Sequence, residues 1–430
     1  MPAILHNPVT HTPDPKAPQP AAGAPALKLI QQGATCVMDY RLSPFCWARL
    51  EAAAQHGPIM GLEMSSQTRV HRWEKVEAPG SFTRLTLFPE GEADDAPVPE
   101  MLSQLHQALD RHRPTTVAIV GWSFKWSLGA LAWCLKNRVP AILLSDSTAI
   151  SNERRWYRES IKRRLVRLFS TAVVAGSPQR DYVASLGMSP NRIFRGWDVV
   201  DNRHFAAGSD AARSDAADQR RRLGLPENYF VSVSRFVELK NLERMLEAYA
   251  AYRAKAGTAA WKLVLIGDGP LRLRLSALQR KLGISDDVLM PGWKSYRELP
   301  AYYGLAGAFV LASLQETWGL VVNEAMASSL PVLVSNRCGC VHDLVQTGRN
   351  GFIFEPLNIP EITSQMLDVA SESSAEQRQM MGDASREIIA DWSPETWADN
   401  LHRATELALS SPRPKAGAIE KLLLRFLTRG

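Results

Sequence analysis

Residues 309–335 read FVLASLQETWGLVVNEAMASSLPVLVS: a short apolar run, a polar loop, a helical pattern and a second apolar run. The apolar runs 309–311 and 331–335 are typical of buried strands, and residues 319–329 are typical of a helix. Two strands that are joined by a helix pair in parallel, because a short hairpin cannot connect parallel neighbours. This stretch therefore predicts one unit of a parallel sheet that helices cover on both faces.

The same alternation continues on both sides of this unit, so we predict a doubly wound α/β domain over residues 225–392. Its other predicted strands are 230–234, 262–266, 288–290 and 352–354, and its other predicted helices are 241–253, 271–282, 296–305 and 374–391. Ligands of such sheets bind beyond the carboxyl ends of the strands, so the loops at those ends become candidate site residues.

A weaker form of the alternation precedes this domain and predicts a second Rossmann-like domain over residues 27–205. Its predicted strands are 34–38, 117–120, 141–144 and 172–175, and its predicted helices are 44–56, 128–136 and 152–169. We expect residues 1–26, which are rich in Pro and Ala, to be a disordered tail, and residues 206–224 to connect the domains as a partly helical linker. Residues 393–430, with a helix cap at Ser393 and an amphipathic run at 418–427, are expected to be helices that pack back on the first domain.

Composition and charge exclude several classes of protein. The 430 residues are 45% apolar and 22% charged, which is typical of a globular chain rather than a disordered or fibrous one. No apolar run approaches the length of a membrane span and no secretory start is present, so we expect a cytoplasmic protein. The cysteine count of five is odd and low, which argues against a disulfide framework. Cys338 and Cys340 have no second pair of ligands nearby, so no metal site is predicted.

The net charge of +6 is concentrated in one predicted helix. Residues 152–169 carry seven Lys or Arg against two Glu, with apolar and aromatic residues between them. Such a helix suits the surface of an anionic membrane. The alternative is a solvated face with an apolar stripe that packs on the sheet. Because the rest of the chain is nearly neutral, nucleic-acid binding is not expected.

Two polar segments follow predicted strands of the second domain. In the first, Arg235 and Lys240 flank a loop that opens a helix at Asn241, and two cations beside a helix start suit a diphosphate. The alternative is a pair of surface cations with a helix cap. In the second, Gly267 and Gly269 allow a tight turn with close backbone approach, which fits a ligand loop or a plain strand-to-helix turn.

Glu316 and Glu324 give the strongest signal. Glu316 ends a loop, and Glu324 lies in an apolar helical run, where an unpaired carboxylate is costly. Vicinal sugar hydroxyls can each donate a hydrogen bond to one carboxylate. The alternative is a helix-face glutamate that pairs with an arginine of the same domain.

In combination, R-x4-K at 235–240 and E-x7-E at 316–324 resemble the donor domain of the family 4 retaining glycosyltransferases of GT-B fold. The resemblance is dense over 229–391, weaker over 140–205 and thin before that. It implies two Rossmann-like domains that face each other across a cleft. It implies Arg235, Lys240 and Glu316 as catalytic residues, with the two cations on the donor diphosphate and Glu316 on the sugar. The donor-binding residues that it implies are Gly267, Asp268, Gly269, Gly292, Trp293, Thr317, Trp318, Gly319, Leu320, Val321 and Glu324, the last on the ribose.

The resemblance also implies the reaction. A hexose would pass, with retention, from a UDP- or GDP-linked donor to a glycan or lipid-linked hydroxyl, as in the synthesis of cell-surface polysaccharide or glycolipid. No D-x-D motif is present, so neither a metal nor another cofactor is expected, and the enzyme would work in the cytoplasm or at the inner face of the cytoplasmic membrane. The alternatives are a sugar-nucleotide epimerase or an inactive relative of the same fold. A nicotinamide dehydrogenase lacks support, because the full glycine fingerprint is missing.

The first domain departs from the family pattern in two places. The loop after the first strand, with Arg41 in it, has no glycine pair. The segment 144–148 keeps Asp146 but lacks the histidine that many members place on the donor sugar. Asp146 and Arg41 remain candidates for acceptor binding. The alternative role of Asp146 is to cap the following helix, and the alternative for Arg41 is a salt-bridged arginine on the surface.

Overall fold

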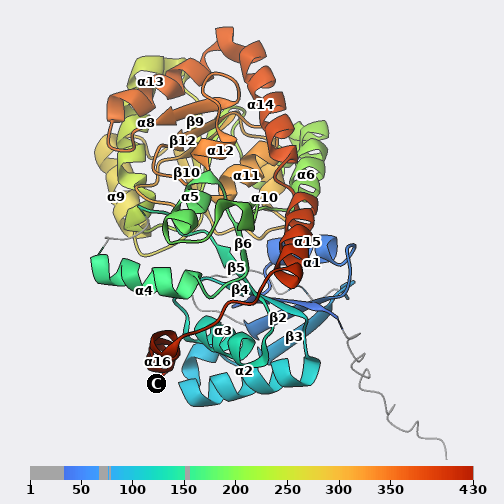
Figure 1. Ribbon diagram of the computed structural model, residues 1–430. Helices are drawn as coiled ribbons and strands as arrows, with labels where there is room; N and C mark the ends of the chain where they lie inside the picture. The colour runs from blue at the N-terminus through green and yellow to red at the C-terminus, as the bar shows by residue number, and fades with distance from the viewer. Residues whose placement is uncertain (1–32, 67–75, 77–78, 151–154, 430) are drawn as a thin grey trace, which may run out of the picture.

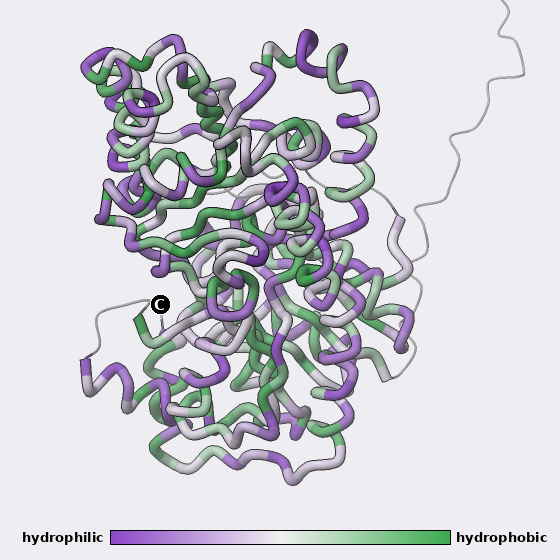
Figure 2. Tube along the Cα trace, turned by 90° about the horizontal axis from the view of Figure 1, so that it is seen from above, coloured by the Kyte–Doolittle hydropathy of each residue, from purple (hydrophilic) through white to green (hydrophobic). Residues whose placement is uncertain are grey.

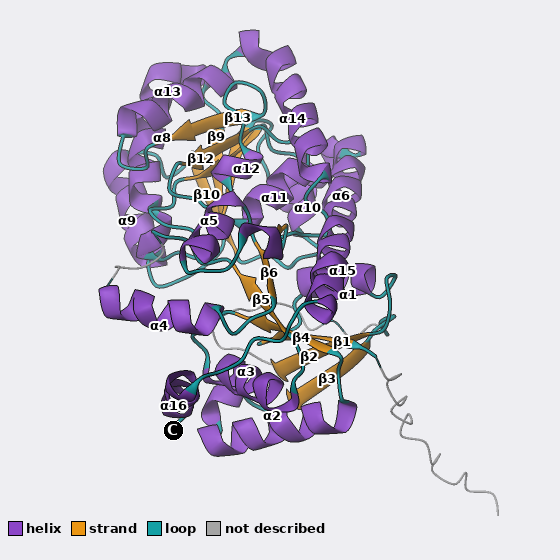
Figure 3. Ribbon diagram, viewed as in Figure 1, coloured by secondary structure: helices purple, strands orange, loops and turns teal. Residues whose placement is uncertain are grey.

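The computed structural model describes residues 33–66, 76, 79–150 and 155–429 of the chain. The expected tail over 1–26 and the first residues of the basic helix lie outside the described residues. Among those described, the chain forms two parallel sheets with helices on both faces of each, stacked one above the other (Figures 1 and 3). The predicted α/β class with two Rossmann-like domains is therefore confirmed.

The first sheet has seven strands in the order β3-β2-β1-β4-β5-β6-β7. They are β1 (Thr35–Asp39), β2 (Ile59–Ser65), β3 (Thr83–Phe88), β4 (Thr116–Val120), β5 (Ala141–Ser145), β6 (Thr171–Val174) and β7 (Ile193–Arg195). Consecutive residues face opposite layers: Cys36 and Met38 join one core cluster, and Val37 between them joins another. Strands buried on both faces read as continuous apolar runs, which is why β1, β4, β5 and β6 could be predicted.

Helices cover both faces of this sheet. One face packs on α2 (Val98–His112), α3 (Lys125–Asn137), α4 (Trp156–Val166) and α5 (Ser177–Ser185). The other packs on α1 (Pro44–Ala53), which begins after Ser43 because the Ser43 side chain accepts from the amide of Cys46 and proline follows at the first helical position. Short 3-10 turns lie at Ala93–Asp95 and Pro190–Arg192.

The second sheet has six strands in the order β10-β9-β8-β11-β12-β13. They are β8 (Tyr229–Val233), β9 (Lys262–Ile266), β10 (Val288–Gly292), β11 (Ala308–Leu311), β12 (Val332–Ser335) and β13 (Gly351–Phe354). One face packs on α8 (Leu242–Ala256), α9 (Arg272–Leu282) and α13 (Ile359–Ala370). The other packs on α10 (Leu299–Gly304), α11 (Leu320–Ala327), α12 (Val341–Leu344) and α14 (Ala375–Ala390). The 3-10 turns are Glu238–Lys240, Gly257–Ala259 and Glu372–Ser374.

The segment that we expected to be a linker is an integral part of the second domain. It forms α6 (Asn202–Ser214) and α7 (Ala216–Leu223). Phe205 and Ala212 of α6 are buried in the same cluster as α10 and α11. The polar composition of this segment predicted a linker. The apolar residues by which α6 packs on its partners form only a narrow stripe, so most of its positions are polar.

The C-terminal helices return to the first domain (Figure 1). Helix α15 (Pro394–Ser410) begins at the predicted cap Ser393, whose side chain accepts from the amide of Thr396. Its residues Trp397 and Leu401 pack against α1 and the first sheet. Helix α16 (Ala418–Leu427) lies on α3 through Leu424.

Hydrophobic segments, green in Figure 2, gather toward the middle of the molecule, and hydrophilic ones lie more often at its periphery. All five cysteines are unpaired and buried. Within the described ranges, no helix combines the length and the apolar character that crossing a membrane requires.

Candidate functional site

Four loops at the carboxyl edge of the second sheet are tied into one rim. The Phe236 amide after β8 donates to the carbonyl of Asp268 after β9, at 2.9 Å, and the Gly267 amide donates to the Gly292 carbonyl at 3.0 Å. The Leu314 amide after β11 donates to the Leu239 carbonyl at 2.8 Å. The rim thus brings most of the predicted donor-binding positions to a single edge.

Glycine is required where two of these loops meet. Gly267 and Gly269 have φ values of +135° and +158°. A Cβ on Gly267 would lie 1.8 Å from the carbonyl oxygen of Ser234, and one on Gly269 would lie 2.6 Å from that of Phe236. Both glycines therefore allow the β9 loop to approach the β8 loop. This close approach also fits the alternative interpretation of the motif as a plain strand-to-helix turn. Asp268 between them is exposed and accepts from the Gly269 amide at 2.8 Å.

The strand order reverses between β8 and β11, and Lys240 and Glu316 meet beyond that point. Lys240 Nζ forms an ion pair with Glu316 Oε1, which also accepts from Ser313 Oγ at 3.0 Å. Asn241 fixes the end of the Lys240 loop, because its side-chain amide donates to the carbonyls of Ala312 and Pro356. Crevices at such reversals are where doubly wound sheets bind ligands.

Arg235 and Trp293 lie on the open side of the rim. Both side chains are exposed, one after β8 and the other after β10. The structure leaves the Arg235 guanidinium in solvent at the edge that also carries Lys240. Trp293 leaves 41% of its surface exposed, and an exposed aromatic ring is a surface on which a planar base can stack.

Glu324 is buried on α11, with only 8% of its surface exposed. Its Oε2 accepts from the hydroxyl of Tyr303 on α10 at 2.7 Å. Burial raises the pKa of Glu324 from 4.5 to about 7, and the Tyr303 hydrogen bond opposes that rise. No arginine or lysine among the described residues pairs with it, so the alternative of an ion pair within the domain is wrong for this part of the chain.

Residues 317–321 lead into α11 and face the first domain. Gly319, with φ at +113°, forms the turn before the helix. The side chain of Trp318 is buried and donates to Asn323 Oδ1 at 3.0 Å, so only the backbone of Trp318 can meet a ligand. Leu320 and Val321 are half-buried at the start of the helix.

Thr317 joins the two domains. Its hydroxyl donates to Asp146 Oδ2 at 2.8 Å, and its carbonyl accepts from Gln179 Nε2 at 2.5 Å. Asp146 follows β5, so the carboxyl edges of the two sheets face each other here. The Asp146 carboxylate therefore contacts the second domain. Burial raises the pKa of Asp146, and the hydrogen bond from Thr317 opposes this.

The first domain adds an acidic residue that sequence reasoning missed. Asp198 follows the three-residue strand β7, and its carbonyl accepts from Asn323 Nδ2 on α11 at 3.1 Å. Burial, then the neighbouring Asp146, raises the pKa of Asp198 to about 8, while Arg49 opposes this. Recognition of β7 as a strand would have placed Asp198 at a carboxyl end and made it a candidate.

Arg41 follows β1 in the first domain. It is buried near Glu63 and Arg84, and burial lowers its pKa while the Glu63 carboxylate raises it. Glu63 lies within β2 and accepts from Arg84 Nε at 2.7 Å and from the Leu42 amide at 2.9 Å. Arg41 is therefore buried and is not the exposed surface arginine of the alternative interpretation.

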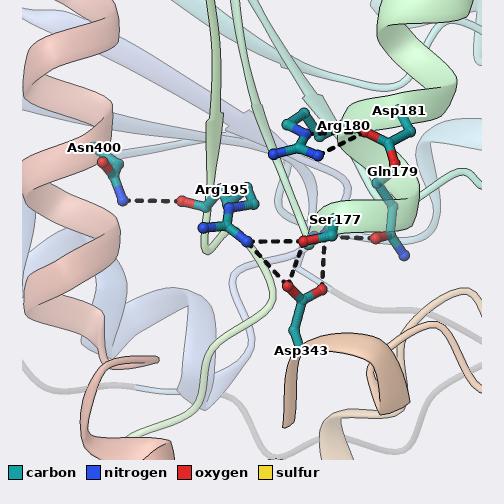
Figure 4. Close-up of polar contacts among 8 residues, drawn as sticks. Ser177, Gln179, Arg180, Asp181, Arg195, Asp343 and Asn400 are labelled. Atoms are coloured by element: carbon teal, nitrogen blue, oxygen red, sulfur yellow. Dashed lines mark hydrogen bonds and ion pairs between the residues drawn. The ribbon is translucent and has the colours of Figure 1, made fainter. Parts of the chain in front are cut away.

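A second polar contact between the domains centres on Asp343 (Figure 4). Its carboxylate, on α12, accepts from the amide and hydroxyl of Ser177 at 2.7 and 2.6 Å and from Arg195 Nη1 at 3.1 Å. Beside it, a cavity of about 410 Å³ is lined from both domains, by Ala149, Tyr182, Cys338 and His342 among others. The orientation of the domains is thus fixed by specific hydrogen bonds on both sides of Thr317.

The second domain is similar to a known protein family. Residues 215–388 match the family model of glycosyl transferases group 1. The sulfoquinovosyl transferase SQD2 of Arabidopsis thaliana is 31% identical over 229 residues, 52% of this chain and 42% of that protein. The alpha-monoglucosyldiacylglycerol synthase of Acholeplasma laidlawii is 32% identical over 136 residues, 31% of this chain and 33% of that protein. The chain thus matches less than half the length of either relative.

Solved structures match over more of the chain. The Anabaena protein HepE, solved in complex with UDP, aligns with a TM-score of 0.67 and 14% identity, over 87% of this chain and 100% of that one. The sucrose-phosphate synthase of Thermosynechococcus elongatus aligns with a TM-score of 0.66 and 17% identity, over 87% and 98%. At such low identity the likeness concerns the fold alone, and the predicted GT-B fold is confirmed.

Proposed function

From the premise that residues 215–388 form a glycosyl transferases group 1 domain, we propose that the chain transfers a hexose from a UDP- or GDP-linked donor to a hydroxyl acceptor, with retention at the anomeric carbon. The observation that carries the proposal is the Lys240–Glu316 pair at the reversal of the strand order. A cation and a carboxylate at that point can serve the diphosphate and the sugar of one donor molecule.

The two cations stabilise the leaving group. Cleavage of the anomeric C–O bond leaves negative charge on the diphosphate, and fixed positive groups lower the barrier where that charge develops. Lys240 is held in place by Glu316 and by the Asn241 anchor, so little reorganisation is needed. Arg235, exposed at the same edge, closes on the diphosphate from the solvent side.

Glu324 binds the ribose. Its carboxylate has one oxygen on Tyr303 and is otherwise surrounded by apolar residues of α11. Two ribose hydroxyls supply the hydrogen bonds that the buried charge needs, and each such bond contributes about 1.5–3 kcal/mol. Because its pKa of about 7 lies near neutral pH, donor binding favours the ionised form and releases a proton.

The acceptor lies on the side of the first domain. Asp146 and Asp198 lie at the carboxyl ends of β5 and β7, facing Thr317 and Asn323 of the second domain. Both are half-buried acids with raised pKa values, and in its ionised form either can accept the proton of an attacking hydroxyl. We keep Asp146 as the first candidate and assign Arg41 no contact with the acceptor.

The acceptor class is a glycan or a lipid-linked hydroxyl. One similar protein, the alpha-monoglucosyldiacylglycerol synthase, is named for a glycolipid product. The basic helix α4 supports a reaction at the inner face of the cytoplasmic membrane. The reaction would need no metal, since the sequence has no D-x-D motif to hold a cation bridge to the diphosphate.

A donor-hydrolysis screen tests the proposal. Purified protein is incubated with UDP- and GDP-hexoses, with and without EDTA, and the released diphosphate is measured. We expect slow release from one donor, unchanged by EDTA, together with thermal stabilisation by the matching nucleoside diphosphate. Stabilisation by NAD alone would refute the transferase assignment, and full inhibition by EDTA would refute metal independence.

A further inference from the structure

Helix α16 has two apolar faces, and only one of them is used. Leu424 is buried on α3, with Leu423 and Leu427 partly buried beside it. Leu422 and Phe426 leave 68% and 69% of their surfaces exposed, and Ile419 on the same stripe leaves 59%. At 100° per residue, the positions 419, 422 and 426 fall within one narrow stripe of the helix. An exposed apolar stripe of this kind on a terminal helix indicates a further contact.

A cationic stripe runs directly beside the exposed apolar one. Lys421 and Arg425 are one helical turn apart, and both are exposed. They line a cavity of about 980 Å³ between α3 and α16, whose floor includes Leu135, Val139 and Leu424. The six cations that line it are Lys136, Arg138, Arg413, Lys415, Lys421 and Arg425, and none of its described lining residues is acidic.

A second cationic cavity lies on the α4 side of the same helix. It measures about 430 Å³ and is lined by Arg163, Arg164, Arg167 and Lys415 against the single carboxylate of Glu420. Arg164 Nη1 and Glu420 Oε1 form an ion pair at 2.8 Å that ties α4 to α16. In the view of Figure 1, α16 lies below α4.

The charge of this region exceeds that of the whole protein. The two cavities share Lys415, so together they present nine cations against one carboxylate, a net charge of +8. The full chain has a net charge of +6, which leaves the remainder at −2. Of the cations, Lys415, Lys421 and Arg425 form no ion pair with any other residue in the described ranges. A ligand with several negative charges and an apolar part complements this region.

We propose that α16, with the two cavities beside it, is a docking surface for an anionic phospholipid bilayer; we call it the α16 surface. Ile419, Leu422 and Phe426 enter the interfacial layer, while the lysines and arginines of the cavities bind lipid phosphates. The inference rests on the proposed function in one respect, since a transferase with a lipid-linked acceptor must reach the membrane. Ile419, Leu422 and Phe426 are exposed rather than buried against another strand or helix. They are therefore available to enter the fluid interfacial layer of a bilayer.

Flotation with lipid vesicles tests this inference on the full chain. We expect binding to vesicles that contain phosphatidylglycerol, weak binding to phosphatidylcholine alone, and loss of binding as salt is added. The double variant Leu422→Ser/Phe426→Ser should bind on the order of tenfold more weakly. The triple variant Lys415→Ala/Lys421→Ala/Arg425→Ala should lose about a hundredfold.

Matched variants of the second domain serve as controls. Leu273→Ser/Met380→Ser removes two exposed apolar side chains, and Arg222→Ala/Lys255→Ala/Lys281→Ala removes three exposed cations. Both should bind vesicles as the unaltered chain does. Thermal unfolding checks that each variant folds, and donor hydrolysis without vesicles should be the same in all of them.

Several outcomes would overturn the docking surface while donor hydrolysis stands. One is equal binding to neutral and anionic vesicles. Another is a dimer that light scattering detects and that Leu422→Ser/Phe426→Ser dissolves, because the stripe would then bind a second copy. A third is stabilisation by free inorganic phosphate in the absence of any vesicle binding. Loss of donor hydrolysis with intact vesicle binding would instead refute the proposed function alone.

Discussion

Glu324 links stability to function through one buried carboxyl group. In the folded chain its pKa is about 7, against an ordinary 4.5. The folded protein thus binds this proton more tightly than the unfolded chain, so the free energy of unfolding falls as pH rises from 4.5 to about 7. The difference between the two pKa values corresponds to a free energy of unfolding that is about 3 kcal/mol lower above pH 7 than below pH 4.5.

Glu324→Gln should therefore stabilise the protein in alkaline buffer. Glutamine keeps an oxygen for the Tyr303 hydroxyl and carries no charge to bury. We expect a gain of about 3 kcal/mol near pH 8 and almost none near pH 5, measured by urea unfolding at both values. The exposed Glu376→Gln serves as control and should change neither. An equal effect at both pH values would show that Glu324 is ionised throughout.

The same substitution should weaken nucleotide binding. The ionised carboxylate accepts from ribose hydroxyls more strongly than a neutral amide does, so the affinity for the matching nucleoside diphosphate should fall about tenfold. Affinity of the unaltered chain should rise as pH increases through 7, and that rise should vanish in Glu324→Gln. Titration calorimetry at several pH values measures both. Unchanged affinity would remove the ribose role.

Lys240→Ala should reduce turnover far more than stability. Its ammonium group is half-buried and pairs with Glu316, which retains the Ser313 hydroxyl when lysine is removed. Loss of one preorganised group for the developing charge costs about 10²–10³ in rate. Donor hydrolysis and thermal unfolding are compared with Lys255→Ala, an exposed lysine on α8. Normal turnover in Lys240→Ala would exclude the diphosphate role.

At the scale of elements, what could be read from the sequence depended on burial. Strands β8, β9 and β11 are apolar runs and were predicted within one or two residues. Strand β2 was missed although all seven of its residues are buried, because Gly61 and Glu63 interrupt its pattern. Glu63 is tolerated there since Arg84, Thr86 and the Leu42 amide supply its hydrogen bonds. Such compensation comes from another strand and leaves no local signal.

Some residues of the candidate site could likewise be predicted from the sequence, and others could not. Lys240, Glu316 and Glu324 belong to spaced motifs at strand ends, so the sequence could nominate them. Asp198 and Asp343 depend on how the two domains meet. Their partners, Asn323 and Ser177, lie 125 and 166 residues away along the chain, and no local pattern reports that pairing.

The contact between α12 and α5 leads to a prediction for Asp343. Its carboxylate accepts three hydrogen bonds from Ser177 and Arg195 and is almost fully buried. Asp343→Ala leaves the Ser177 amide without an acceptor and leaves Arg195 only the Ser177 hydroxyl, so we expect a loss of about 1–3 kcal/mol. Small-angle scattering should also show a larger radius of gyration, because the domains are then held by fewer bonds. The exposed Asp181→Ala on α5 is the control.

At the scale of the whole molecule, the order of elements along the chain differs from their grouping in space. Helix α15 follows the second domain in sequence but completes the core of the first, where Trp397 packs with residues of α1 and β1. Arg49 of α1 lies between the rings of Trp197 and Trp397, 5.6 Å from each, and donates to the Trp197 carbonyl at 2.7 Å. The first domain is therefore built from both ends of the described chain.

Trp397→Ala should accordingly destabilise the first domain, although Trp397 lies beyond the second in sequence. The side chain is 1% exposed, and removal of a buried tryptophan typically costs about 3–5 kcal/mol. Trp156→Ala on α4, where 84% of the surface is exposed, makes the same chemical change and should cost less than about 0.5 kcal/mol. Hydrogen exchange should show faster opening of β1, β4 and α1 in Trp397→Ala, with β8, β9 and α8 protected as before. Equal loss of protection in both domains would show that the two cores unfold as one cooperative unit. The prediction that the first domain opens independently of the second would then be wrong.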